Sequence, residues 1–185
     1  MNLHNVHFSG NDITSIGDEA FRMCYSLQSF AMTSGMSSIG LSAFSECTSL
    51  TSVIFPKNQV SISDEAFCKS GIIELSASIS NCGSRPFADC SSLVKVTVRG
   101  SLGQGMFSNC SMLSSATMLG SMSVIPEKCF FNCKSLEALA FDDAKTVTRV
   151  EDYAFAGCSK ISQFGTYNTS LTYIGKSAFS ETAAT

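Results

Sequence analysis

A phenylalanine returns along the chain at nearly constant spacing, and this period constrains the fold more than any other feature. The spacings between successive members are 23, 23, 20, 20, 23, 25 and 24 residues. The members are Phe21, Phe44, Phe67, Phe87, Phe107, Phe130, Phe155 and Phe179. Copies of one unit at this period predict a solenoid, in which each unit buries its apolar side chains against its neighbours.

The positions around the phenylalanine also repeat. An apolar residue lies five positions before it, as Ile16 and Ile39 do, and a leucine lies six positions after it in most units. The unit reads I-x-x-I-G-x-x-A-F-x-x-C-x-S-L-x-x-V-x-F. The third unit is one residue short after its phenylalanine, and Ser70 takes the place of its cysteine.

Each part of the unit predicts a local structure. The segment L-x-x-V-x-F ends in alternation, which indicates a short strand, and identical strands one coil apart can pair only in parallel. The Ile-Gly pairs indicate a turn in which glycine relieves a backbone constraint. The segment A-F-x-x-C indicates one tight turn, too short for a stable α-helix. The stacked phenylalanines would then form a spine inside the coil.

We therefore expect a repeat solenoid of short parallel strands, turns and 3-10 segments, with little α-helix. Residues 1–12 form a lead-in, and residues 13–185 form a single solenoid of about seven full coils plus a partial eighth.

The strings IGDEAFRMCYSLQSF, IGLSAFSECTSLTSVIFP and VEDYAFAGCSKISQF resemble the BspA-like leucine-rich repeat, and the resemblance covers residues 13–182. Members of this family are surface proteins of host-associated bacteria and mucosal protists. The resemblance implies a curved right-handed coil with a parallel sheet on its concave side, an adhesin-like role at the cell surface, and no cofactor. The chain departs from the pattern where Cys82 replaces an inward isoleucine, and the proline that often follows the strand remains only at Pro56.

Composition excludes several other classes of protein. The net charge of −3 and the absence of a basic run argue against binding to nucleic acid or an anionic membrane. Hydrophobic residues make up 44% and charged residues 15%, which argues against disorder. No apolar run approaches the roughly 20 residues of a membrane helix, and no secretion signal opens the chain.

The repeat begins by residue 13 and still runs at Phe179, so we expect an excised piece of a longer protein. Its ends lack the polar caps that repeat arrays need, which predicts end-to-end association in solution.

Six of the nine cysteines occupy one column, three residues after the phenylalanine. They are Cys24, Cys47, Cys90, Cys110, Cys133 and Cys158. We expect a buried structural ladder of thiols that donate weak hydrogen bonds to the neighbouring coil; a disulfide or a zinc site are the alternatives. Of the other three, Cys82 is expected to point inward, and Cys68 and Cys129 to be partly exposed.

No constellation for catalysis emerges, so we expect no enzyme and neither catalytic nor metal residues. The only histidines are His4 and His7, before the first full unit. The pairs Asp18-Glu19, Asp64-Glu65 and Glu151-Asp152 recur just before Ala-Phe. A recurring pair indicates a solvated turn of the repeat, with a weak calcium site as the alternative.

The outward side chains of the strands form a candidate binding face on the concave side, which is small, polar and nearly uncharged. Its residues are Gln28, Ser29, Thr51, Ser52, Ile54, Glu74, Ser76, Val94, Lys95, Thr97, Ser115, Thr117, Glu137, Ala140 and Gln163. Aromatic and arginine side chains, which dominate interface hot spots, come near it only at Phe55 and Arg99.

This face predicts a non-catalytic protein-interaction module. The family resemblance implies that the module belongs to a surface protein and binds a host protein or the extracellular matrix. The alternative is a structural spacer or stalk with no binding of its own. A sequon at Asn168 would carry a glycan if the protein is secreted in a eukaryote.

Overall fold

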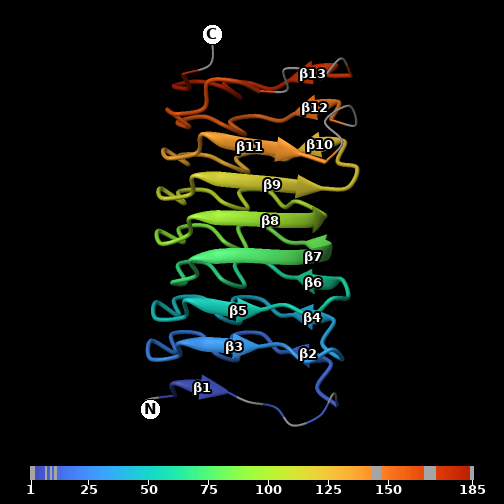
Figure 1. Ribbon diagram of the computed structural model, residues 1–185, viewed down its shortest axis with the longest axis vertical. Helices are drawn as coiled ribbons and strands as arrows, with labels where there is room; N and C mark the ends of the chain where they lie inside the picture. The colour runs from blue at the N-terminus through green and yellow to red at the C-terminus, as the bar shows by residue number, and fades with distance from the viewer. Residues whose placement is uncertain are drawn as a thin grey trace.

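The computed structural model describes residues 3–6, 8, 10, 12–142, 147–164 and 170–183. Coils of the chain stack along one axis into a parallel β-solenoid of about seven turns, with the two termini at opposite ends of the stack (Figure 1). The described residues form strands and turns and contain no helix. The predicted fold class, a solenoid of parallel strands, is confirmed.

The first track of strands follows the L-x-x-V-x-F segments. Its members are β1 (Asn5–Val6), β3 (Ser29–Ala31), β5 (Ser52–Ile54), β7 (Glu74–Cys82), β8 (Lys95–Gly100), β9 (Ser115–Leu119) and β11 (Ala138–Phe141). All of its strand pairs are parallel, as the repeat requires. The expected lead-in contributes to this track, because β1 pairs with β3. We call this track the ribbon.

A second track of short strands contains the apolar residue five positions before the phenylalanine, which in β2, β4 and β13 is the isoleucine of an Ile-Gly pair. Its members are β2 (Ser15–Ile16), β4 (Ser38–Ile39), β6 (Val60–Ile62), β10 (Val124–Ile125), β12 (Arg149–Val150) and β13 (Tyr173–Ile174). Successive isoleucines pair in register, Ile16 with Ile39 and Ile39 with Ile62. The interpretation of Ile-Gly as a turn was therefore wrong for the isoleucine, which is a strand residue.

The two tracks merge in β7, which is nine residues long. Its first part pairs with β8 and its last part with β6, where a register shift lies between Val60 and Ser61. The strand orders are β1-β3-β5, β11-β9-β8-β7-β6-β4-β2 and β10-β12-β13. The long β7 thus lies in the middle of the seven-stranded sheet and joins the ribbon strands β8, β9 and β11 to the second-track strands β6, β4 and β2.

The repeated phenylalanines stack as a spine along the core. Neighbouring ring centroids lie between 4.9 Å (Phe44 and Phe67) and 6.0 Å (Phe87 and Phe107) apart, and the rings are stacked in every step. The inner members are fully buried, whereas Phe21 and Phe179 in the outermost coils are partly exposed. Since burying such a side chain contributes about 1.5–3 kcal/mol, the end coils gain less than the central ones.

The tight turn around each phenylalanine has two residues in the left-handed backbone region, two positions before and two positions after it. In the first coil these are Glu19 and Met23, with φ of 55° and 58°. Their N–H groups donate to the carbonyl oxygens of Leu41 and Ser45 in the next coil. The conformation costs about 1–2 kcal/mol for a non-glycine residue, and these bonds between coils offset it. Glycine occupies this position only at Gly105 and Gly157.

The glycine of the Ile-Gly pair is needed for close approach between coils and not for an unusual backbone angle. A Cβ atom on Gly40 would lie 2.5 Å from Asp18 Oδ1 and 2.6 Å from the Asp18 nitrogen. The Asp18 carboxylate in turn accepts the Leu41 N–H at 2.7 Å. Asp64 and Asp152 accept an N–H of the following coil in the same way. The aspartate of each recurring acidic pair, three residues before the phenylalanine, therefore ties one coil to the next.

The first two glycines of this column provide a matched pair of substitutions. Gly40→Ala should destabilise the fold by about 1–3 kcal/mol, because its methyl group meets the backbone of Asp18. Gly17→Ala should cost less than about 0.5 kcal/mol, because nothing lies within 4 Å of a Cβ there. Urea unfolding followed by circular dichroism measures both, and equal costs would contradict the close-approach explanation.

Candidate functional site

The structure places all residues of the predicted binding face at the surface. Ser29, Val94, Thr97, Ser115 and Thr117 are partly exposed, and the other members are exposed. Parallel pairing aligns them in columns, since Glu74 lies opposite Lys95, and Lys95 opposite Ser115. The column beside it runs from Ser76 through Thr97 and Thr117 to Ala140.

The columns join the members on β7, β8, β9 and β11 into one continuous surface. Gln28, Ser29, Thr51, Ser52 and Ile54 lie on the coils of β3 and β5, which belong to a separate sheet. Gln163 lies outside any strand of the described chain. Whether this face binds a partner stays a prediction.

An open hollow lies where the two sheets of the ribbon meet. It measures about 500 Å³, and its lining comes from β5 with Phe55, from the start of β7, and from Lys95 and Thr97 of β8. Ile54 is one of the residues that line the hollow. Its surface is 62% exposed, more than that of any other large hydrophobic residue in the described part of the chain. The sequence signal for this feature is the single residue missing from the third unit.

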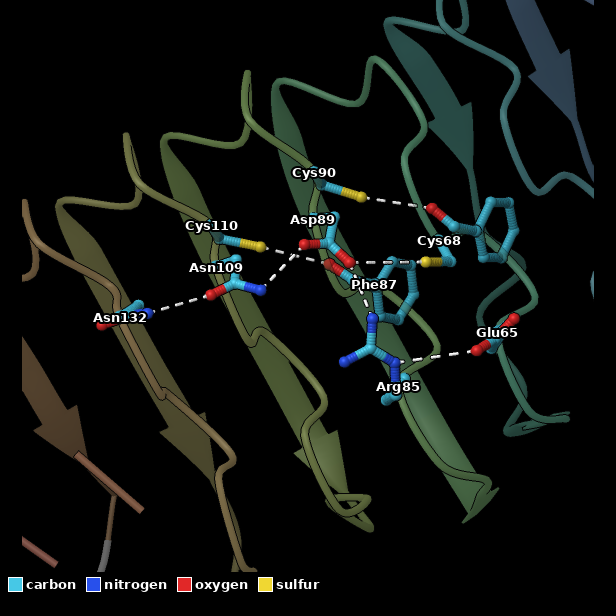
Figure 2. Close-up of polar contacts among 10 residues, drawn as sticks. Glu65, Cys68, Arg85, Phe87, Asp89, Cys90, Asn109, Cys110 and Asn132 are labelled. Carbon is cyan, nitrogen blue, oxygen red and sulfur yellow. Dashed lines mark hydrogen bonds and ion pairs between the residues drawn. The ribbon is translucent and has the colours of Figure 1, made fainter. Parts of the chain in front are cut away.

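The cysteine column forms hydrogen bonds that each cross from one coil to the preceding one. The Sγ atoms of Cys47, Cys90, Cys110, Cys133 and Cys158 lie 2.9–3.2 Å from the carbonyl oxygens of Phe21, Phe67, Phe87, Phe107 and Phe130. Ser70 continues the column, with its hydroxyl 3.3 Å from Cys90 Sγ. Figure 2 shows two of these thiols beside the carbonyls that they reach.

The structure differs from expectation for some cysteines. Cys24 is only partly buried. Cys68 and Cys129 were expected to be partly exposed, and this was wrong: both are buried, with exposed fractions of 4% and 0%. Cys82 is partly exposed. All nine cysteines are free thiols.

Burial raises the pKa of several thiols. The pKa of Cys47 rises to about 12 and that of Cys68 to about 11 because desolvation disfavours the thiolate. Desolvation also raises the pKa of Cys82 to about 12. These thiols are weak nucleophiles at neutral pH, since the thiolate is the reactive form.

A ladder of polar side chains runs beside the thiols on the turn edge of the solenoid (Figure 2). Asn132 donates to Asn109 at 3.2 Å, and Asn109 donates to Asp89 at 2.8 Å. Arg85 completes it, with 2.7 Å to Asp89 and 3.7 Å to Glu65. Each residue of this ladder has a partner within it on a neighbouring coil or turn, so the ladder helps to hold the coils together.

The remaining candidate groups for chemistry are dispersed. Within the described ranges, no three histidine, cysteine or acidic side chains converge as metal ligands would. His4 is exposed near the first strand, and His7 lies outside the described residues. Asn168 of the second sequon also lies outside them. No helix in the described part of the chain could cross a membrane.

Known proteins share the repeat and the fold described above. The family model "BspA type Leucine rich repeat region (6 copies)" matches residues 14–137 and 99–185. The chain belongs to the BspA-type leucine-rich repeat family. No curated protein matches the chain.

Solved structures of leucine-rich repeat proteins share this fold. A protein from Eubacterium ventriosum has 22% identity and a TM-score of 0.76, and the match covers 85% of this chain and 44% of that one. The protein TpLRR of T. pallidum has 24% identity and a TM-score of 0.69, with 82% and 72% covered. The pneumococcal vaccine antigen PcpA has 18% identity and a TM-score of 0.53, with 88% and 50% covered. The chain thus spans less than half of the first of these proteins.

The different burial of the thiols predicts their order of reaction. Cys24 should react with a thiol reagent in the native state near pH 8, Cys82 much more slowly because of its raised pKa, and all nine thiols only after unfolding. Cys24→Ser should remove the fast reaction, whereas Cys82→Ser should leave it. A fast reaction that persists in Cys24→Ser would contradict this order.

The raised thiol pKa values also predict a loss of stability in alkali. A thiol whose pKa is higher in the folded state contributes its full stability below the unfolded pKa of about 8.5, and loses it as the pH rises toward the folded value. For Cys47 this window extends to about 12. Inside its window, each such thiol lowers the free energy of unfolding by about 1.4 kcal/mol for each pH unit of increase.

Urea unfolding under reductant from about pH 7 to about pH 10 measures this slope. Cys47→Ser keeps a hydroxyl donor near the Phe21 carbonyl but removes the titration. The variant should therefore lose less stability with rising pH than the wild type. Parallel curves for the two proteins would contradict the prediction, because other titrating groups are common to both.

Proposed function

We propose that the chain is a non-catalytic protein-interaction module of a protein at the cell surface or outside the cell. Its partner is a host protein or a matrix component, which it contacts with the outward face of the ribbon. The observation that carries this proposal is the set of exposed columns across β7, β8, β9 and β11, which end at an open hollow beside Ile54. The vaccine-antigen description of the pneumococcal protein of the same fold supports an exposed location.

The face suits recognition of a protein for physical reasons. Its hydroxyl columns offer donors and acceptors at the regular spacing of neighbouring strands, about 4.8 Å. Because the strands are packed from inside, the face is rigid, and binding to it costs little conformational entropy. The recurring aspartates accept backbone N–H groups between coils, so their role in the repeat is structural.

The proposal is tested by binding of the purified chain to a panel of matrix proteins and to epithelial cells. Thr97→Arg combined with Thr117→Arg places two bulky cations on neighbouring strands of the face. The matched control is Ser91→Arg combined with Ser111→Arg, at exposed turn positions of the same coils. The first pair should weaken binding by about tenfold or more, and the control should leave it unchanged.

Absence of saturable binding by the wild-type chain to the whole panel would refute the proposal and favour the structural spacer. Equal loss in both double variants would refute the ribbon as the binding face. Unfolding midpoints of all variants, compared with the wild type, separate lost binding from lost folding.

A further inference from the structure

The ribbon is interrupted between β5 and β7. β5 is the edge strand of its sheet, and the two strands belong to different sheets. The first half of β7 pairs with β8 on one side, while its pairing with β6 begins only at Ile79. Gly71, in the short third unit, lies so close to the preceding coil that a Cβ atom on it would meet the carbonyl oxygen of Thr48.

Two hollows open along this interruption and share a wall. The hollow of about 500 Å³ and a neighbouring one of about 260 Å³ are both lined by Phe55, Ser76 and Thr97. The second hollow adds Pro56, Lys57, Arg99 and Leu119. Together they form one groove across the strands, which we call the seam groove.

The seam groove is basic although the whole chain carries a net charge of −3. It presents Lys57, Lys95 and Arg99 against the single carboxylate of Glu74, and no carboxylate lines the end that holds Lys57 and Arg99. Among the described residues, the ion pairs of the molecule engage other cations and do not reach these three. Two cations without a counter-charge favour an anionic group between them.

An apolar surface adjoins these cations. Ile54 is 62% exposed, and Phe55 and Leu119 line the groove beside it. A ligand that fills the groove would remove this apolar surface from water, and each Å² buried would contribute about 25 cal/mol to the free energy of binding. The groove thus combines a site for carboxylates with a site for an aliphatic side chain a short distance away.

We propose that the seam groove binds an acidic peptide segment of the partner protein. The segment lies extended across the strands, with carboxylates at Lys57 and Arg99 and an aliphatic side chain against Ile54 and Phe55. This inference rests on the proposed function and names the part of the face that gives it specificity. Nucleic acid is disfavoured, because a long polyanion would also meet the net negative charge of the rest of the molecule.

The test uses two fluorescein-labelled peptides and the intact chain in fluorescence anisotropy. One peptide contains aspartate, glutamate and leucine, and in the other every acid is replaced by its amide. The wild type should bind the acidic peptide about tenfold more tightly than the amide peptide. This preference should shrink when the salt rises from about 50 mM to about 300 mM.

Three variants assign the contacts. Lys57→Gln combined with Arg99→Gln should abolish the preference for the acidic peptide, whereas the matched control Lys134→Gln combined with Lys160→Gln, at exposed lysines outside the groove, should keep it. Ile54→Ser should weaken the binding of both peptides by about fivefold, since this substitution removes only the aliphatic contact. Equal affinity of the wild type for both peptides, or equal loss in the control, would overturn the proposal.

A heparin fragment is the competing anion in the same assay. If heparin binds more tightly than the acidic peptide, and Ile54→Ser leaves heparin binding unchanged, the ligand is a sulfated glycan and the assignment of a peptide is overturned. If the chain binds the matrix panel through the ribbon but Lys57→Gln with Arg99→Gln keeps that binding, the seam groove is refuted and the proposed function stands. If the panel shows no binding, the proposed function itself fails.

Discussion

The contact between one coil and the next is the interaction on which the rest of the structure depends. Neighbouring phenylalanine rings of the spine stack with their centroids 4.9–6.0 Å apart, near the spacing of about 4.8 Å between paired strands. No coil can bury its own phenylalanine, because both faces of the ring are covered by other coils. The N–H groups of the left-handed turn residues, the thiols and the aspartates all act across the same short interval.

This constraint divides the chain into residues that stack and residues that are free for function. Inward positions must be apolar and nearly identical from coil to coil, so they carry no information about a partner. The outward strand positions are under no such demand, and they differ between coils, as Glu74, Lys95 and Ser115 do in one column. The place where the stacking itself is irregular, between β5 and β7, is also the place where a hollow opens and cations lack counter-charges.

Much of the fold could be predicted because the same pattern occurs in many copies, so that each position of the unit can be compared between copies. The ribbon strands, the phenylalanine spine and the inward direction of the cysteine column each follow from one residue type at one position in many copies. The second track of strands could not be predicted in this way. Ile39 and Gly40 look like a turn signal, and only the approach of Asp18 from the preceding coil shows that glycine is there to make room. The left-handed turn residues also gave no signal, because types as different as Met23, Lys69 and Tyr153 occupy them.

By itself, the sequence determined the class of fold, the number of residues per coil and the repeated columns whose side chains face the core. These follow from period and alternation, which are properties of the chain alone. Only the tertiary structure decided how neighbouring coils meet: where β7 joins two tracks, which thiol reaches which carbonyl, and where the ribbon opens into a groove. The reason is that the residues of each such contact lie some twenty positions apart, and the pattern within one unit does not say how that unit meets the next.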